Sequence, residues 1–171
     1  RAYYHFLGPK TFEDATRELA LPRKGKTDNL RFIDVAKINP NLRLPYELRP
    51  DLIGIYEGKS ILINSAGIRD DHEITIKKEH AFRIVGIGDS VMFGQGVDFQ
   101  NSYGEILEKK LGSLLGGKEI EFINLAVPGY NRTMEVETFI KKRTIYKPDL
   151  VIIGFVSNDL DMPYFIGKKE D

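Results

Sequence analysis

The sequence predicts an α/β protein built on a parallel sheet, preceded by an extension that contains a β-hairpin. From residue 81 onward, short apolar runs alternate with segments of helical period, which is typical of strand–helix–strand units. The three runs are residues 82–87, 119–125 and 150–156. We therefore expect an N-terminal extension over residues 1–80 and an α/β core over residues 81–171.

The extension is uneven in composition, and residues 1–50 hold five of the eight prolines. Thr11 is expected to cap a short helix, and a basic loop follows it. Residues 30–38 form a second short element whose period fits neither a helix nor a strand clearly. Residues 52–56 and 60–64 flank Glu57-Gly58-Lys59, which predicts a hairpin.

Two helices are expected between the strands of the core. Asn101 or Ser102 is predicted to cap the first helix, and Thr133 the second. Gly116-Gly117 and Pro148 are expected to end them. The first helix is predicted to carry its apolar residues on one stripe: Tyr103, Ile106, Leu107, Leu111, Leu114 and Leu115. The second is predicted to use Val136, Phe139 and Ile140. The strand over residues 150–156 is nearly all apolar, so both its faces are expected to be covered.

Composition excludes several classes of function. The 25 basic and 25 acidic residues cancel, which argues against a general nucleic-acid or anionic-membrane binder. The chain has no cysteine, so disulfides and thiolate chemistry are excluded, and with three histidines a zinc site is not expected. The longest apolar run, residues 150–156, is too short to span a bilayer. Because the chain begins with Arg1, we expect that a preceding segment was removed.

Polar residues follow each predicted strand: Gly88-Asp89-Ser90, residues 128–131 and residues 157–159. Each set taken alone is an ordinary turn former. The carboxyl ends of parallel strands lie along one edge of a sheet, so we expect the three loops to converge. Together they would supply a hydroxyl from Ser90, a backbone N–H from Gly129 and a carboxamide from Asn158. A nucleophile with donors for an oxyanion is what acyl transfer needs.

These loops resemble the three sequence blocks of the SGNH (GDSL-type) hydrolases over residues 82–162. Val91 replaces a frequent leucine of the first block, and Val156 replaces the usual glycine of the third. The resemblance implies that Ser90 is the nucleophile of an esterase or acyl hydrolase. The Ser90 N–H, the Gly129 N–H and the Asn158 side chain would form the oxyanion hole. The resemblance further implies a three-layer, flavodoxin-like fold whose parallel sheet has the strand order 2-1-3-4-5. It implies no cofactor, and a small-molecule, carbohydrate or lipid ester as substrate.

The family's remaining catalytic pair is an Asp-x-x-His near the C-terminus, and this chain contains no such motif. We expect that pair beyond Asp171, so residues 81–171 are expected to form only the first three strands of the sheet. His80 precedes the first strand, roughly 20 Å from Ser90 at about 3.3 Å per residue. His72 lies in a charged turn and His5 near the terminus. We therefore expect this chain to hydrolyse activated esters weakly or not at all.

Three further expectations concern partners, compartment and alternatives. The third strand would be an edge, a template for pairing with another chain. We expect the chain to continue beyond Asp171 and cover it; the alternatives are cover by the extension or self-association with a second subunit through this edge. Residues 48–69 resemble a segment of extracytoplasmic family members, which favours an extracytoplasmic or membrane-anchored protein. The alternatives are an O-acyltransferase, a non-catalytic binding module on the same fold, and a phosphate or nucleotide binder that uses Gly86 and Gly88. The last lacks the usual glycine-rich signatures.

Overall fold

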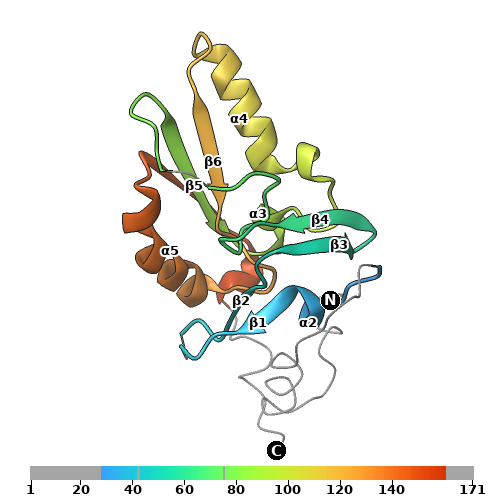
Figure 1. Cartoon of the computed structure of the whole chain (residues 1–171). Coiled ribbons are helices and arrows are strands. Elements are labelled where there is room, and N and C mark those ends of the chain that lie inside the picture. Colours follow the sequence, from blue (N-terminus) through green and yellow to red (C-terminus); the bar gives the residue numbers. More distant parts are fainter. Residues whose placement is uncertain (1–27, 42, 75, 161–171) are drawn as a thin grey trace, which may run out of the picture.

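The computed structural model describes residues 28–41, 43–74 and 76–160 (Figure 1). The helix predicted after Thr11 and the basic loop that follows it lie outside the described residues. None of the helices in the described part of the chain is both long enough and apolar enough to cross a membrane.

A three-stranded parallel sheet forms the centre of the α/β part (Figure 1). Strand β5 (Phe82–Gly88) lies between β6 (Ile120–Asn124) and β7 (Leu150–Gly154). Successive side chains of a strand point to opposite faces. Accordingly, Ile84 belongs to one buried cluster and Val85 to another. The three predicted strands and their parallel arrangement are confirmed, each within two residues of its expected ends.

Helix α4 (Tyr103–Leu114) follows β5 and packs mainly on β6. Ser102 precedes it, although its side chain makes no capping hydrogen bond. The predicted apolar stripe is confirmed only in part. Leu107 and Leu111 pack against the core, and the Tyr103 ring lies edge-on to that of Phe122 with centroids 6.1 Å apart, although Tyr103 is 49% exposed. The other three are exposed: Ile106 41%, Leu114 79% and Leu115 54%.

Gly104 explains this orientation of α4. It is the buried residue of the helix, and the ring of Phe122 from β6 lies directly against it. A Cβ atom at position 104 would lie 2.7 Å from Phe122 Cε1, closer than carbon atoms approach. The helix therefore approaches β6 along Gly104, Leu107 and Leu111, a face that counting apolar residues does not reveal.

Helix α5 (Arg132–Tyr146) also differs from its prediction. Asn131 is its N-cap, with its side chain accepting a hydrogen bond from Met134 N at 3.2 Å, so the predicted Thr133 cap is wrong. Phe139 packs against the core as expected, but Val136 and Ile140 are 41% and 48% exposed. The buried face instead holds Met134, Glu135, Thr138 and Tyr146. Because Glu135 and Thr138 are polar, a hydropathy pattern does not identify this face as the buried one.

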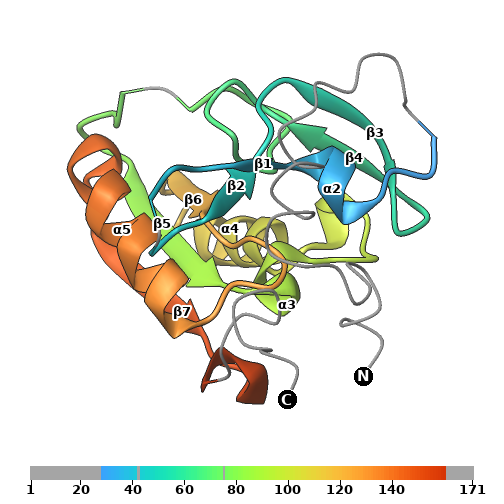
Figure 2. The same ribbon diagram turned by 90° about the horizontal axis from the view of Figure 1, so that it is seen from below.

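The extension forms two antiparallel hairpins at the end of the sheet where β5 and β6 finish (Figures 1 and 2). A helical turn, α2 (Phe32–Val35), runs into β1 (Ala36–Ile38), which pairs with β2 (Tyr46–Leu48). This resolves the ambiguous period of residues 30–38, because one helical turn over residues 32–35 is followed by a strand over residues 36–38. Strands β3 (Leu52–Tyr56) and β4 (Lys59–Ile63) confirm the predicted hairpin, which turns at Glu57-Gly58.

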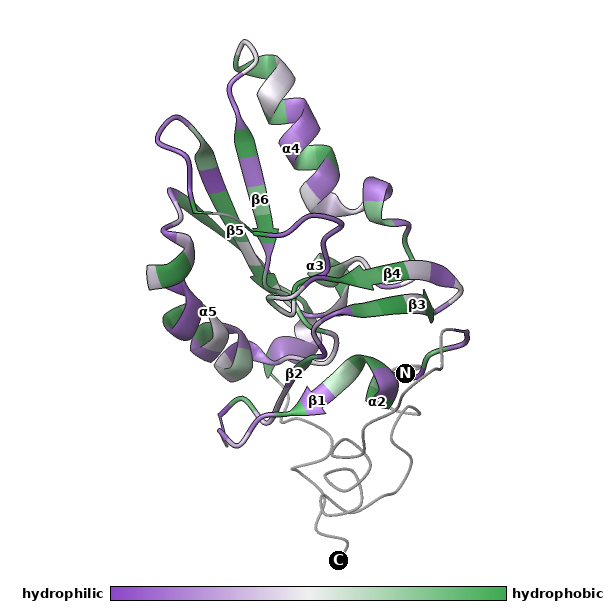
Figure 3. Cartoon of the chain, in the orientation of Figure 1, coloured by the Kyte–Doolittle hydropathy of each residue, from purple (hydrophilic) through white to green (hydrophobic). Residues whose placement is uncertain are grey.

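The hairpins and the sheet share one hydrophobic cluster. Its members include Phe32, Tyr46 and Ile63 from the extension and Ile84 and Phe122 from the sheet. Strands of both parts are mostly hydrophobic in Figure 3, whereas α4 and α5 carry many hydrophilic residues. The extension therefore packs onto the core rather than standing apart from it.

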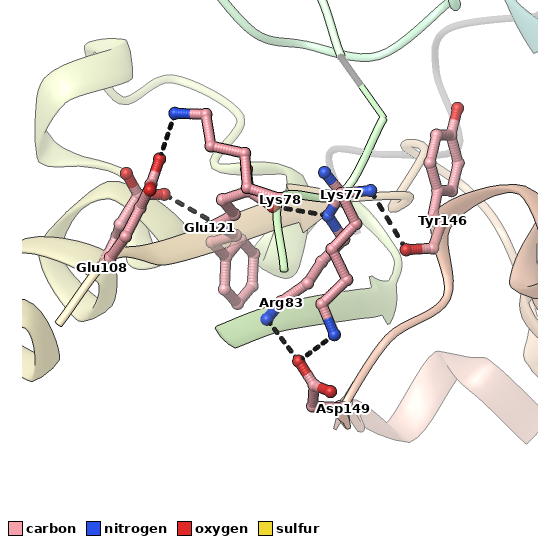
Figure 4. Close-up of polar contacts among 9 residues, drawn as sticks. Lys77, Lys78, Arg83, Glu108, Glu121, Tyr146 and Asp149 are labelled. Atoms are coloured by element: carbon pink, nitrogen blue, oxygen red, sulfur yellow. Dashed lines mark hydrogen bonds and ion pairs between the residues drawn. The ribbon is translucent and has the colours of Figure 1, made fainter. Parts of the chain in front are cut away.

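Charged side chains join the three strands at the opposite end of the sheet (Figure 4). The buried Arg83 of β5 donates to Glu121 of β6 at 2.6 Å and to the Tyr146 carbonyl at 3.1 Å. Its backbone N–H donates to Asp149, just before β7, at 2.8 Å. Lys77 also pairs with Asp149. A buried guanidinium needs such partners, so this cluster fixes the strands relative to one another.

Strand β7 pairs with β5 on one side, and no strand in the described residues pairs with its other side. Leu150 and Ile153 are 45% and 55% exposed. The expectation that both faces of this strand are covered is therefore wrong for the described part of the chain. Self-association through this edge stays a prediction.

We expect Gly104→Ala to lower the free energy of unfolding by about 1–3 kcal/mol, because the added methyl would overlap Phe122. Helix propensity alone predicts the opposite sign, a gain of about 1 kcal/mol. The control is Gly112→Ala in the same helix, where the nearest atom, Lys118 O, is 3.4 Å from the added carbon. We expect that variant to be neutral or stabilised. Urea unfolding compares the two, and equal effects would contradict the packing argument.

Candidate active site

Ser90 begins helix α3 (Ser90–Phe93) directly after β5, and its side chain is buried. Asp89 is the N-cap of this helical turn, with its Oδ1 accepting from Val91 N at 2.9 Å. At Gly88 a Cβ atom would lie 2.6 Å from Met92 Cβ. The glycine therefore lets α3 fold back against the strand end, which places Ser90 at the carboxyl edge of the sheet.

The Asp89 carboxylate brings Ser90 and Asn158 together. Its Oδ2 accepts from Ser90 Oγ at 3.3 Å and from Asn158 Nδ2 at 3.2 Å. The hydroxyl and the carboxamide thus lie no further apart than these two distances combined. This is well inside the roughly 10 Å beyond which an oxyanion-hole assignment fails, since such donors must reach one atom. Sequence reasoning missed this role of Asp89, although an aspartate before a helical turn is a recognisable N-cap.

The loop after β6 holds Gly129 and lies beside the Ser90 loop. Asn124 joins the two loops, since its Nδ2 donates to Met92 O at 2.8 Å while its Oδ1 accepts from Ala126 N at 3.1 Å. Val127 N donates to Gly88 O at 3.3 Å. Gly129 has φ +78°, a backbone conformation that side chains disfavour. The expected convergence of the first two loops is therefore present in the backbone.

Arg132 and Asp159 hold the third loop. The loop contains a 3₁₀ turn, η3 (Ser157–Leu160), in which Asp159 Oδ2 accepts from Val156 N at 2.9 Å. The same oxygen accepts from Arg132 Nη2 at 2.9 Å, and the guanidinium also lies over the Phe155 ring, 5.3 Å from its centroid. This network orients the turn that carries Asn158. Sequence reasoning did not find it: Asp159 lies in the third resembling block, but nothing in the sequence links it to Arg132.

Glu135 extends the network into the protein interior. Its side chain is fully buried and pairs with Arg132 Nη1, while its Oε1 has no hydrogen-bond partner among the described residues. Burial raises the pKa of the Glu135 carboxyl to about 7, and the neighbouring Asp159 and Asp89 act in the same direction against Arg132. Near neutral pH this carboxyl therefore exchanges a proton close to the candidate site.

Arg69 from the extension fixes the far end of α3. Its guanidinium is buried and donates to Phe93 O at 3.0 Å, Gly94 O at 2.6 Å and Val97 O at 2.6 Å. Burial lowers the pKa of Arg69, opposed by Asp98. The extension therefore contacts the loop that carries Ser90 directly, which the sequence did not predict.

Neither described histidine is placed as a base for Ser90. His72 is largely exposed and pairs with Asp71 and Asp70. His80 lies in the turn before β5, at the opposite end of that strand from Ser90. His5 lies outside the described residues. The ligand atoms of Asp70, Asp71 and His72 lie within 4.8 Å of one another, but exposed acidic groups often gather without a metal ion.

Asp89→Asn tests the importance of the shared carboxylate. An amide has a single acceptor oxygen, so it cannot accept from Ser90, Val91 and Asn158 as the carboxylate does. We expect the free energy of unfolding to fall by about 1–3 kcal/mol in urea unfolding. Asp28→Asn, at an exposed position, should change it by less than about 0.5 kcal/mol. Equal effects of the two variants would argue against the network.

Glu135 predicts a pH dependence of stability. Its folded pKa of about 7 lies above the ordinary 4.5, so between these values the folded state holds a proton that the unfolded state has released. The contribution of Glu135 to the free energy of unfolding therefore falls as pH rises through this window. Unfolding measured from about pH 5 to about pH 8 should show Glu135→Gln gaining stability relative to the unmodified protein. The exposed Glu79→Gln should show no such trend; a flat difference for Glu135→Gln would refute the raised pKa.

Comparison with protein families places these loops in a known group. The model of the GDSL-like lipase/acylhydrolase family matches residues 84–170, half of the chain. This segment contains Ser90, Gly129 and Asn158. No curated protein and no solved structure gave a significant match. The chain therefore belongs to the GDSL-like lipase/acylhydrolase family.

Proposed function

We propose that this protein hydrolyses an ester through Ser90, with the Ser90 N–H, the Gly129 N–H and the Asn158 carboxamide as oxyanion donors. Family membership supports the reaction class. The observation that carries the residue assignment is the Asp89 oxygen that binds Ser90 Oγ and Asn158 Nδ2 at once. A nucleophile and a donor from two distant segments are thereby held at a common point.

In the proposed reaction, Ser90 Oγ attacks the ester carbonyl carbon and its proton passes to a general base. The carbonyl electrons move onto oxygen, and the oxyanion accepts hydrogen bonds from the three donors. Collapse breaks the bond to the alkoxide oxygen, which takes the proton back from the base and leaves as the alcohol. Water then gives a proton to the base and attacks the acyl carbon; the bond to Ser90 Oγ breaks, Oγ regains the proton and the carboxylic acid leaves. A carboxamide has two N–H donors, so Asn158 can keep its bond to Asp89 while the other N–H binds the oxyanion.

We place the general base outside the described residues, because His72 and His80 lie elsewhere. The histidine of an Asp-x-x-His pair is the base that the family resemblance implies. The exposed side chains of Val91 and Phe155, 68% and 60% accessible, flank the Ser90 and Asn158 loops and support an acyl group with an apolar portion. The ester could belong to a small molecule, a carbohydrate or a lipid.

We also infer a three-layer, flavodoxin-like core over residues 81–171, with residues 1–80 as its extension. The strand order β6-β5-β7 supports this, since it matches the 2-1-3 part of a doubly wound sheet. The carboxyl edge of such a sheet is the usual place for a ligand, and the Ser90 loop lies there.

A non-catalytic binding module is the second candidate. Within the described residues, the Ser90 hydroxyl donates to a carboxylate and has no histidine partner, which would suit a protein that has kept the fold without the chemistry. Labelling with an electrophilic probe separates the two candidates, because only an activated serine reacts with it.

The experiment is labelling of the 171-residue chain with a fluorophosphonate probe, with and without added imidazole as an external base. We expect slow labelling that Ser90→Ala abolishes and that Asn158→Ala slows by about 10²–10³-fold. Ser113→Ala, on the exposed side of α4, should label like the unmodified chain. Peptide mapping identifies the labelled serine.

Labelling that survives Ser90→Ala, or no labelling even with imidazole, would contradict the assignment of the nucleophile. Rapid ester turnover that Ser90→Ala abolishes would instead show that the chain itself contains the base.

A further inference from the structure

Tyr46 of the extension contacts the peptide group that carries the Gly129 N–H. Its hydroxyl donates to Pro128 O at 3.1 Å, and Pro128 C=O and Gly129 N–H belong to the same peptide unit. The Tyr46 side chain is buried, with 2% of its surface exposed, and so is that of Tyr130, which follows Gly129 and is 1% exposed. The contact joins residues 82 positions apart in the chain.

A peptide unit is planar and, in this loop, trans, so its N–H points away from its C=O. A donor that fixes the direction of the Pro128 carbonyl thereby fixes the direction of the Gly129 N–H. A hydrogen bond to the carbonyl also polarises the amide, which makes its N–H a stronger donor.

We propose that Tyr46 is a positioning residue of the oxyanion hole, which orients and polarises the Gly129 N–H through the Pro128 carbonyl. The proposal rests on the proposed function for its catalytic meaning, since it is the ester oxyanion that the Gly129 N–H would bind. The orientation of the peptide unit is a property of the folded protein and can be tested separately.

Tyr46 is itself held from several sides. Tyr130, one residue beyond Gly129, donates its hydroxyl to the Tyr46 carbonyl at 2.9 Å. Each tyrosine hydroxyl therefore donates to a backbone carbonyl of the other segment, β2 or the loop. Burial raises the pKa of Tyr130, which keeps this hydroxyl protonated as a donor. The Tyr46 ring packs edge-on against Phe32, with centroids 5.2 Å apart, and lies 5.3 Å from the Tyr130 ring.

The same contact accounts for glycine at position 129. A Cβ atom there would lie 2.9 Å from the Tyr46 hydroxyl oxygen, and the φ of +78° is unfavourable for any side chain. The hydroxyl thus occupies the space that a side chain would need. The loop and the extension therefore fit each other at this point only because residue 129 is glycine.

The first test is the amide NMR signal of Gly129 in Tyr46→Phe, which keeps the ring and removes the hydroxyl. Loss of the hydrogen bond to Pro128 O should move the Gly129 ¹⁵N and ¹H shifts and speed exchange of that amide with solvent. Tyr146→Phe is the matched control, because Tyr146 is also buried but packs at the far end of β5. It should leave the Gly129 signal in place.

The second test is the rate of fluorophosphonate labelling of Ser90. We expect Tyr46→Phe to lower the maximal labelling rate about tenfold, less than deletion of a donor itself, with the half-saturating probe concentration unchanged. Tyr146→Phe should label at the unmodified rate. A purely structural role of Tyr46 would lower the melting temperature of Tyr46→Phe but leave its maximal labelling rate equal to that of Tyr146→Phe.

The two tests keep the proposals distinguishable. If the unmodified chain does not label, the proposed function fails, and the Gly129 signal alone decides whether Tyr46 orients the peptide. An unmoved Gly129 signal in Tyr46→Phe overturns the positioning role whatever the labelling shows. If the unmodified chain labels, an unchanged labelling rate in Tyr46→Phe also overturns the positioning role.

Discussion

The candidate site depends on one buried carboxylate, that of Asp89. An acidic side chain that is 2% exposed needs hydrogen-bond donors to compensate for its lost hydration. Asp89 obtains them from Val91 N, from the Ser90 hydroxyl and from the Asn158 amide. Because these donors come from the loops after β5 and β7, satisfying one carboxylate brings two strand ends together. The site is thus a consequence of where Asp89 is buried.

The extension takes part in the same arrangement. Arg69 binds three carbonyls at and just beyond the end of α3, and Tyr46 binds the carbonyl before Gly129. Each extension residue thus contacts a different loop of the core. Since the hairpins and the sheet also share a hydrophobic cluster, the geometry of the loops and the folding of the extension depend on each other. A core without its extension would lack these supports.

The third loop is supported by charge rather than by apolar packing. Arg132 lies between the carboxylates of Asp159 and Glu135, two acids and one base in a buried place. The excess negative charge there is relieved if Glu135 holds a proton, in accord with its raised pKa. A buried network of charged groups favours one arrangement of its side chains, because leaving any of these groups without a hydrogen-bond or ion-pair partner is costly. The turn with Asn158 thereby gains a fixed orientation.

The strands, the hairpin and the position of Ser90 follow from the sequence by itself, because apolar runs and turn residues are local signals. The faces of α4 and α5 do not: Gly104 is buried against Phe122 of β6, and Glu135 is buried where Arg132 of its own helix also binds Asp159 of the third loop. The same holds for Tyr46, whose partner is 82 residues away. Only the tertiary structure decides such contacts, because packing and hydrogen bonding between distant segments leave no periodic trace in the chain.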